Sequence, residues 1–75
     1  MKISDLQDKK IINITDGKNI GTISDLEIDE KGFITYIHSI ESKFFIKLFS
    51  ANKETIFKIS DIKKIGKDVI LVQID

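Results

Sequence analysis

The sequence predicts an all-β domain, a small and partly open antiparallel barrel of about six strands with a short helical turn before the last strand. Apolar and polar residues alternate in several short runs, which is the period of a β-strand, and glycine-centred turns separate these runs. The alternation slips by one residue between Ile23 and Leu26, which predicts a bulge or sharp bend at Ser24-Asp25. Such a bulge lets a strand curl, as a small barrel requires.

Length and composition indicate a single domain over residues 1–75. Hydrophobic residues make up 41% of the chain and charged residues 32%, which is the range of folded globular proteins. The absence of cysteine excludes disulfides, thiolate metal ligands and thiol nucleophiles, and favours a cytoplasmic location. Residues 1–5 lack the start of a signal peptide, and no apolar run approaches the roughly 20 residues of a membrane span. We expect a cytoplasmic protein that does not span a membrane.

The charge balance argues against nucleic acid as a partner. Twelve basic residues, all of them lysine, face twelve acidic residues, and the formal net charge is zero. Without a net positive field the chain does not concentrate a polyanion around itself. Without arginine it also lacks the side chain that contacts phosphate and guanine through two parallel hydrogen bonds.

The stretch from Asp16 to Gly32 is expected to organise the fold as one long strand between two glycine turns. Asp16-Gly17 is a typical hairpin-turn dipeptide, because glycine accepts the positive φ that tight hairpin turns require and aspartate tolerates it. We assign structural roles in turns or the bulge to six residues: Gly17, Gly21, Ser24, Asp25, Gly32 and Gly66.

Local patterns predict the remaining elements. Residues 4–7 fit a capping box and predict one turn of helix, and residues 10–14 read as a strand. Residues 33–40, 55–59 and 69–74 also read as strands, the first of them contacted on both faces. Ser60 and Asp61 occupy an N-cap position, and Ile62 and Ile65 form the apolar stripe of a helical turn that ends at Gly66.

A tetrapeptide recurs three times. Residues 3–6 read Ile-Ser-Asp-Leu, residues 23–26 repeat it, and residues 59–62 read Ile-Ser-Asp-Ile. The first and third copies precede lysines and an isoleucine-rich strand, so they are either matching capped corners of the sheet or a coincidence in a chain rich in these residues.

Three carboxylates were considered as a catalytic or metal site. Asp25, Glu27 and Asp29 lie two residues apart on one face of the long strand and could converge on a cation. Solvation opposite the apolar face explains Glu27 and Asp29 better, because carboxylates are seldom buried unpaired. Asp25 is expected to accept hydrogen bonds from nearby backbone amides at the bulge.

The single histidine does not complete a metal site. His38 lies on a strand with apolar neighbours, and without cysteine it has no obvious co-ligands. A packed or half-exposed core histidine is the favoured interpretation. Nucleotide-binding, phosphate-loop and serine-nucleophile motifs are absent from the sequence, so we predict no catalytic residues, no metal site and no cofactor.

Four segments together resemble the PRC-barrel family: Lys10 to Asn13 before the Asp16-Gly17 turn, Ile20 to Asp29, Gly32 to Ile34, and Ile62 to Val72 with its Ile-Gly-Lys-Asp-Val-Ile-Leu-Val ending. The likeness is greatest to the short, stand-alone sporulation-associated proteins of Gram-positive spore formers, and it covers nearly the whole chain. It implies a six-stranded barrel that acts as a docking module, without catalytic residues. The chain departs from this branch at residues 57–59, where relatives carry isoleucine, proline and tryptophan.

The resulting functional hypothesis is a non-enzymatic protein-interaction module connected with sporulation. An RNA or ribosome-assembly adaptor is the alternative, since a ribosome-maturation factor shares the fold, and a metal-dependent enzyme using the three carboxylates is less favoured. The protein partner is unknown, and a homodimer is the simplest assembly to expect.

The partner surface is predicted at the aromatic run of residues 43–49. Phe44, Phe45 and Phe49 are the candidate anchors, because exposed aromatic side chains carry much of the energy of an interface. This run is either a strand or a short helix, and it either forms an interface or closes the barrel as part of the core.

Overall fold

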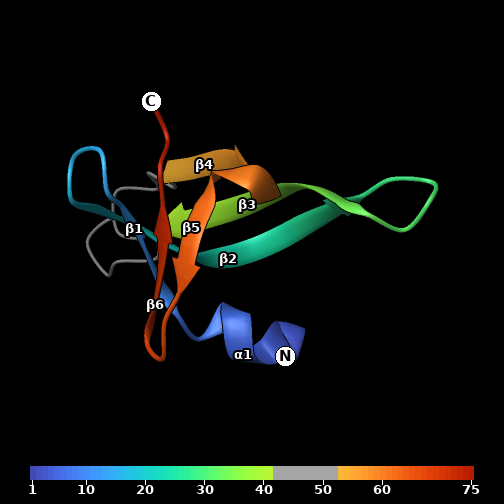
Figure 1. The fold of residues 1–75 in the computed structure, drawn as a ribbon, viewed down its shortest axis with the longest axis horizontal. Coiled ribbons are helices and arrows are strands. Elements are labelled where there is room, and N and C mark those ends of the chain that lie inside the picture. The colour runs from blue at the N-terminus through green and yellow to red at the C-terminus, as the bar shows by residue number, and fades with distance from the viewer. Residues whose placement is uncertain (42–52) are drawn as a thin grey trace.

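The computed structural model describes residues 1–41 and 53–75 of the chain (Figure 1). The predicted segment 43–49 lies outside the described residues. The elements in chain order are α1 (Ile3–Gln7), β1 (Lys10–Asn13), β2 (Lys18–Ile28), β3 (Ile34–Glu41), β4 (Lys53–Lys58), the 3-10 helix η1 (Ile59–Asp61), β5 (Ile62–Ile65) and β6 (Val69–Val72).

All six strands form one curled sheet in the order β4-β3-β2-β1-β6-β5, with β4 and β5 at its two edges. The prediction of a small, partly open all-β barrel is therefore confirmed. One pairing differs from the antiparallel expectation, because β1 and β6 run parallel, from Lys10 beside Val69 to Asn13 beside Val72. These two strands are joined through the whole chain between them and not by a hairpin, so nothing in the local turns fixes their relative direction.

Strand β2 holds the two halves of the sheet together. Its first residues pair with β1, with Gly21 beside Ile11, and its later residues pair with β3, beginning with Thr22 beside Ile40. The change of partner occurs at Gly21, which has a φ of 102° and lies so close to β3 that an added Cβ would be 2.1 Å from the carbonyl oxygen of Ile40. A side chain at this position would clash with the backbone of β3.

The bulge lies where the apolar alternation slips. The register of β2 against β3 shifts between Ile23 and Asp25. Ser24 Oγ donates a hydrogen bond to the carbonyl of His38 at 3.2 Å, and Asp25 Oδ1 accepts one from the backbone N–H of Leu26 at 2.8 Å. Both side chains therefore bond to backbone, and Ile23 and Leu26 reach the same apolar cluster despite their spacing of three.

The two glycine turns flank β2. Gly17 (φ 72°) precedes β2, where Asp16 Oδ1 accepts the N–H of Lys18 at 2.9 Å. Gly32 (φ 89°) belongs to the turn after β2, where Asp29 Oδ1 accepts the N–H of Phe33 at 3.0 Å.

Residues 62–65 correct the helical prediction. The helical turn is present as η1, but it ends at Asp61, and Ile62 to Ile65 form strand β5. The register of β5 against β6 shifts between Ile62 and Lys64, so a bulge brings about the three-residue spacing that was interpreted as a helical stripe. Gly66 consequently lies in the β5–β6 hairpin, where its N–H donates to the carbonyl of Val69 at 2.8 Å.

The first and third copies of the repeated tetrapeptide are matching corners. Each follows a lysine and forms a short helical segment, and in each the aspartate accepts a hydrogen bond at 3.0 Å from the backbone N–H three residues earlier, Lys2 for Asp5 and Lys58 for Asp61. These carboxylates satisfy an amide that would otherwise have no partner at a helix start. The middle copy is the β2 bulge, so one local sequence serves two geometries.

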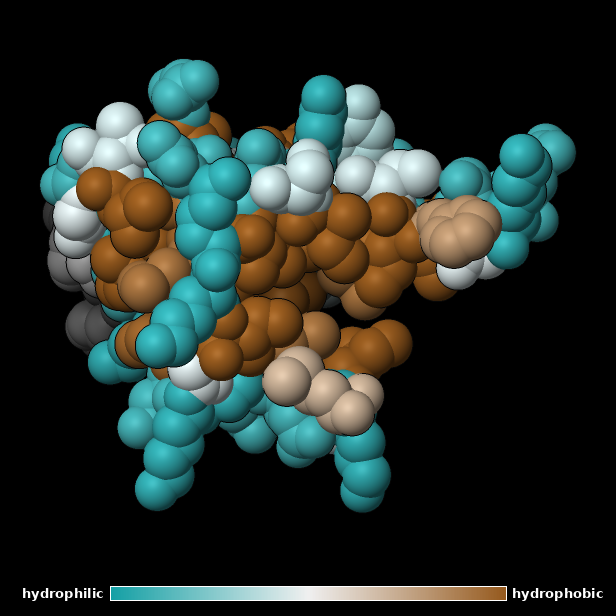
Figure 2. Space-filling model, in the orientation of Figure 1, coloured by the Kyte–Doolittle hydropathy of each residue, from teal (hydrophilic) through white to brown (hydrophobic). Residues whose placement is uncertain are grey.

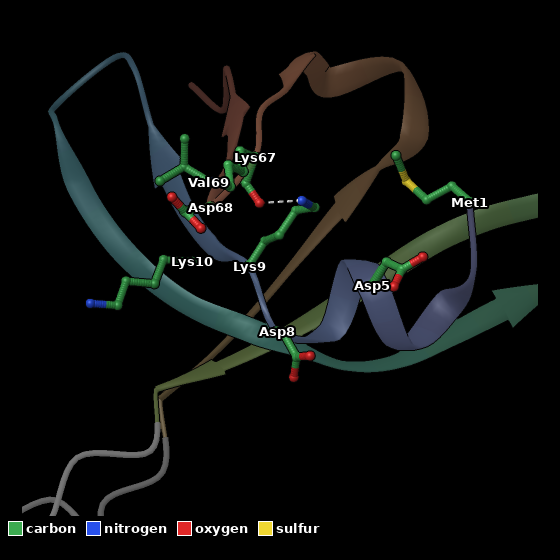
Figure 3. Close-up of a pocket in the computed structure, with 8 residues that line it drawn as sticks. All are labelled: Met1, Asp5, Asp8, Lys9, Lys10, Lys67, Asp68 and Val69. Atoms are coloured by element: carbon green, nitrogen blue, oxygen red, sulfur yellow. Dashed lines mark hydrogen bonds between the residues drawn. The ribbon is translucent and has the colours of Figure 1, made fainter.

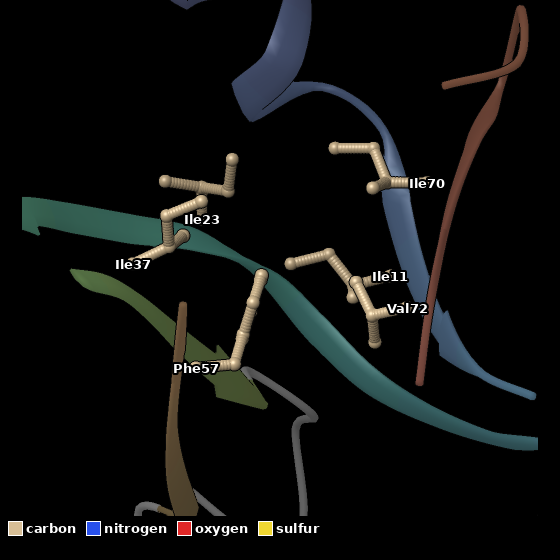
Figure 4. Packing of buried hydrophobic residues seen from close by; sticks show 6 residues of the cluster. All are labelled: Ile11, Ile23, Ile37, Phe57, Ile70 and Val72. Carbon is tan, nitrogen blue, oxygen red and sulfur yellow. The ribbon is translucent and has the colours of Figure 1, made fainter. Parts of the chain in front are cut away.

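Within residues 1–41 and 53–75, six buried apolar side chains point toward one another from five strands and form the core (Figure 4): Ile11, Ile23, Ile37, Phe57, Ile70 and Val72. On β3, Ile37 is 2% exposed, and Ile34 and Ile40 are half-buried, with Ile34 packed against the core. The expected contact on both faces does not extend to Tyr36, which is 40% exposed.

Candidate docking cleft

His38 lies on the outer face of the sheet between two glutamates. Its Nε2 is 2.7 Å from Oε2 of Glu27 on β2, and its Nδ1 is 3.5 Å from Oε2 of Glu54 on β4. The hydrogen bond to Glu27 is the main cause that raises the pKa of His38 above its ordinary value, with Glu54 adding to the effect and partial burial opposing it. The group ties three strands together. His38 is half-buried, as expected, but it does not belong to the apolar core cluster.

The three carboxylates of β2 and the turn that follows it do not converge. Asp25 accepts the amide of Leu26, Glu27 pairs with His38, and Asp29 accepts two amides of the β2–β3 turn. Among residues 1–41 and 53–75, no group of three or more histidine, cysteine, aspartate or glutamate side chains is arranged to hold a metal ion.

One hollow, which we call the polar hollow because six of its eight lining residues are charged, lies beside α1 and the β5–β6 turn (Figure 3). It has a volume of about 840 Å³, and its lining includes three lysines and three aspartates. Lys9 Nζ donates to the carbonyl of Lys67, while the side chains of Asp8 and Lys10 point away from this contact (Figure 3). Lysine and aspartate side chains are mixed along the lining and do not gather around one point. The hollow therefore lacks the arrangement of an ion-binding or phosphate-binding site.

Another hollow is an apolar cleft of about 240 Å³, which we call the isoleucine cleft. Figure 2 shows hydrophobic residues along the projecting β2–β3 hairpin and a recess between this hairpin and the part of the molecule that carries α1. Six elements contribute to the cleft, and every lining residue is isoleucine or leucine: Ile3, Leu6, Ile23, Leu26, Ile34, Ile37, Ile59, Ile62, Ile65 and Ile70.

The isoleucine cleft opens directly onto the core. Ile23, Ile37 and Ile70 are buried members of the core, whereas Ile3 and Ile59 on the walls are 55% and 48% exposed. The cleft is therefore a seam of the partly open barrel, at which apolar surface that a closed barrel would bury remains accessible. A contiguous apolar surface of this kind typically marks a site of interaction.

Sequence analysis did not find the isoleucine cleft. Its lining residues belong to separate local patterns, in the core or on the faces of strands, and no local pattern indicates that α1, β3 and β5 lie together. The predicted partner anchors Phe44, Phe45 and Phe49 lie outside the described residues and stay a prediction.

Comparison with known proteins agrees with this architecture. The fold defines a small β-barrel module, and residues 1–75 match the PRC-barrel domain family. The chain belongs to the PRC-barrel family, which confirms the resemblance drawn from the sequence. It is similar to a probable sporulation protein, YlmC, of Bacillus subtilis (strain 168), with 33% identity over 75 residues that cover 99% of this chain and 93% of the relative. Within the described residues, no helix is long and apolar enough to cross a membrane.

Proposed function

We propose that this chain is a non-enzymatic docking module of the cytoplasm, connected with sporulation, which binds an apolar segment of a protein in the isoleucine cleft. The observation that carries the proposal is the lining of the cleft, which is aliphatic throughout and continuous with the core. Aliphatic surface offers no acid, base or nucleophile, but it gains free energy when an apolar group displaces water from it, at about 25 cal/mol per Å².

The connection with sporulation rests on the relative, whose name is that of a probable sporulation protein. The identity of 33% extends over nearly the full length of both chains, so the likeness concerns the whole domain and not one motif.

The two other hypotheses receive less support. An RNA adaptor needs a continuous basic surface, whereas the lysines of the polar hollow alternate with aspartates. An enzyme using Asp25, Glu27 and Asp29 needs these carboxylates to converge, whereas each is engaged in its own hydrogen bond.

The proposal is tested by capture from sporulating cells with a matched pair of variants. Ile65→Ser alters a wall of the cleft that is 40% exposed, and Ile56→Ser alters a residue of the outer face that is 49% exposed. We expect a protein that is captured by the wild type and by Ile56→Ser but lost with Ile65→Ser, and whose purified form binds with a negative heat-capacity change. Equal capture by both variants, or none by the wild type, would contradict the docking function.

A further inference from the structure

Phe33 is an exposed aromatic side chain on a fixed backbone. It follows Gly32 in the β2–β3 turn, and its side chain is 67% exposed. Its N–H donates to Asp29 Oδ1 at 3.0 Å, and its carbonyl accepts the N–H of Asp29 at 2.9 Å. Because the turn is already ordered, a contact made by this ring loses little conformational entropy on binding.

The isoleucine cleft can hold such a ring. Its volume is about 240 Å³, and an apolar cavity of about 150 Å³ lined by similar residues is large enough to bind benzene. The ring of Phe33 has the shape of that ligand, and Phe33 does not belong to the lining of the cleft in its own chain.

We propose that a second copy of this chain occupies the isoleucine cleft, with Phe33 of each copy inserted into the cleft of the other. This inference rests on the proposed function of the cleft as a docking site, and it names the partner. In this arrangement the two insertions are related by a two-fold axis, so that the assembly closes as a dimer, whereas one insertion repeated head to tail would give an open chain of copies.

The charges beside the two surfaces are complementary. The turn that carries Phe33 contains Asp29 and Glu30, both exposed, and Lys31 is its only cation. On β5, Lys63 and Lys64 are exposed between the cleft residues Ile62 and Ile65. Insertion of the ring therefore brings an acidic turn of one copy toward a basic strand of the other, and opposite charges at the rim select orientation and speed association.

The exposed apolar area is close to what such a dimer needs. A standard interface buries roughly 800 Å² per partner, of which a little over half is non-polar. On the cleft and the hairpin, five large side chains are between 40% and 67% exposed: Ile3, Ile28, Phe33, Ile59 and Ile65. At roughly 150 Å² for a fully exposed large apolar side chain, the exposed parts of these five supply on the order of 400 Å² per copy.

Sedimentation equilibrium of the purified chain, from micromolar to millimolar concentration, tests the inference. We expect a monomer–dimer equilibrium. In Phe33→Ser its dissociation constant should rise at least about tenfold, because the variant loses the aromatic side chain at the centre of the interface. Ile56→Ser, on the outer face, should leave the constant unchanged. Circular dichroism verifies that both variants are folded. A monomer over the whole range, or a dimer that is indifferent to Phe33→Ser, would overturn the inference.

Cysteine cross-linking locates the contact, because the chain has no cysteine of its own. Mixing the single variants Phe33→Cys and Ile65→Cys should give a disulfide-linked pair on mild oxidation, whereas Phe33→Cys with Ile56→Cys should not. Equal yields from the two mixtures would contradict insertion into the cleft. If the chain is a monomer but Ile65→Ser still abolishes capture from sporulating cells, this inference fails while the docking function stands.

Discussion

The side-chain amide of Asn13 pairs with the backbone of Ile74 in both directions. Its Nδ2 donates to the carbonyl of Ile74 at 3.2 Å, and its Oδ1 accepts the N–H of Ile74 at 3.1 Å. Asn13 is only 7% exposed, and Ile74 lies beyond the end of β6. The side chain of Asn13 thus takes the place of a backbone N–H and C=O, and it extends the hydrogen bonding between β1 and β6 beyond Val72.

Asn13→Asp should lower the free energy of unfolding by about 1–3 kcal/mol, because a carboxylate oxygen would replace the donor that faces the carbonyl of Ile74. Urea denaturation at neutral pH measures the change. Asn19→Asp is the matched control, since the side chain of Asn19 accepts a hydrogen bond from the N–H of Gly21 at 2.8 Å and donates none to the residues that the structure describes, and aspartate can accept the same bond. An equal loss of stability in both variants would contradict the role of the Asn13 donor.

Gly21→Ala should destabilise the domain by about 3 kcal/mol or more, because it adds a clash with the carbonyl of Ile40 to the strain of a positive φ. Gly17 also has a positive φ, but no atom lies within 4 Å of an added Cβ, so Gly17→Ala should cost only about 1 kcal/mol. Thermal and urea unfolding of the two variants measure the difference. Similar losses of stability in the two variants would show that the close approach of β2 to β3 is not the reason for glycine at position 21.

The Glu27–His38 pair should make stability depend on pH. The pKa of His38 is raised in the folded state, so its stabilisation is present below the unfolded pKa near 6.5 and is lost as the pH rises through the higher folded pKa. The difference in melting temperature between the wild type and Glu27→Gln should therefore be larger at a pH of about 6 than at about 8.5. If the difference in melting temperature is the same at both pH values, or if it persists when His38→Gln is also present, the Glu27–His38 pair is not its cause.

The two aspartate-capped corners should respond alike to loss of the carboxylate. Asp5→Ala and Asp61→Ala each remove the acceptor of a backbone N–H at a helix start and should each cost about 1 kcal/mol. Because the two carboxylates accept from different backbone N–H groups and share no hydrogen-bond partner, the double variant should show the sum of the two losses in urea denaturation. Strong non-additivity would mean that the corners are not independent caps.

Much of the fold could be predicted because its determinants are local. The Asp16-Gly17 turn, the bulge at Ser24-Asp25 and the capped corners depend on residues within a few positions of one another. The error at Ile62 and Ile65 has the same local origin, because two apolar residues three apart suit a helical turn and a bulged strand equally, and only the pairing of β5 with β6 distinguishes them.

The candidate site could not be predicted in the same way. Glu27, His38 and Glu54 come together through the registers of β2, β3 and β4, which the sequence does not display. The isoleucine cleft needs six elements to be placed in space before its lining exists. Only Phe33 carried a local signal, as an aromatic residue directly after a glycine turn.

The parallel pairing of β1 with β6 has a consequence for the chain during its synthesis. Because β6 lies between β1 and β5 in the sheet, a nascent chain made only as far as Lys67 has all of β1 to β5 but no strand to cover the outer edge of β1. That edge and the core residue Ile11 stay open until Val69 to Val72 leave the ribosome. The domain therefore folds late in translation, and chaperones or other nascent chains can reach the bare edge of β1 before its own strand does.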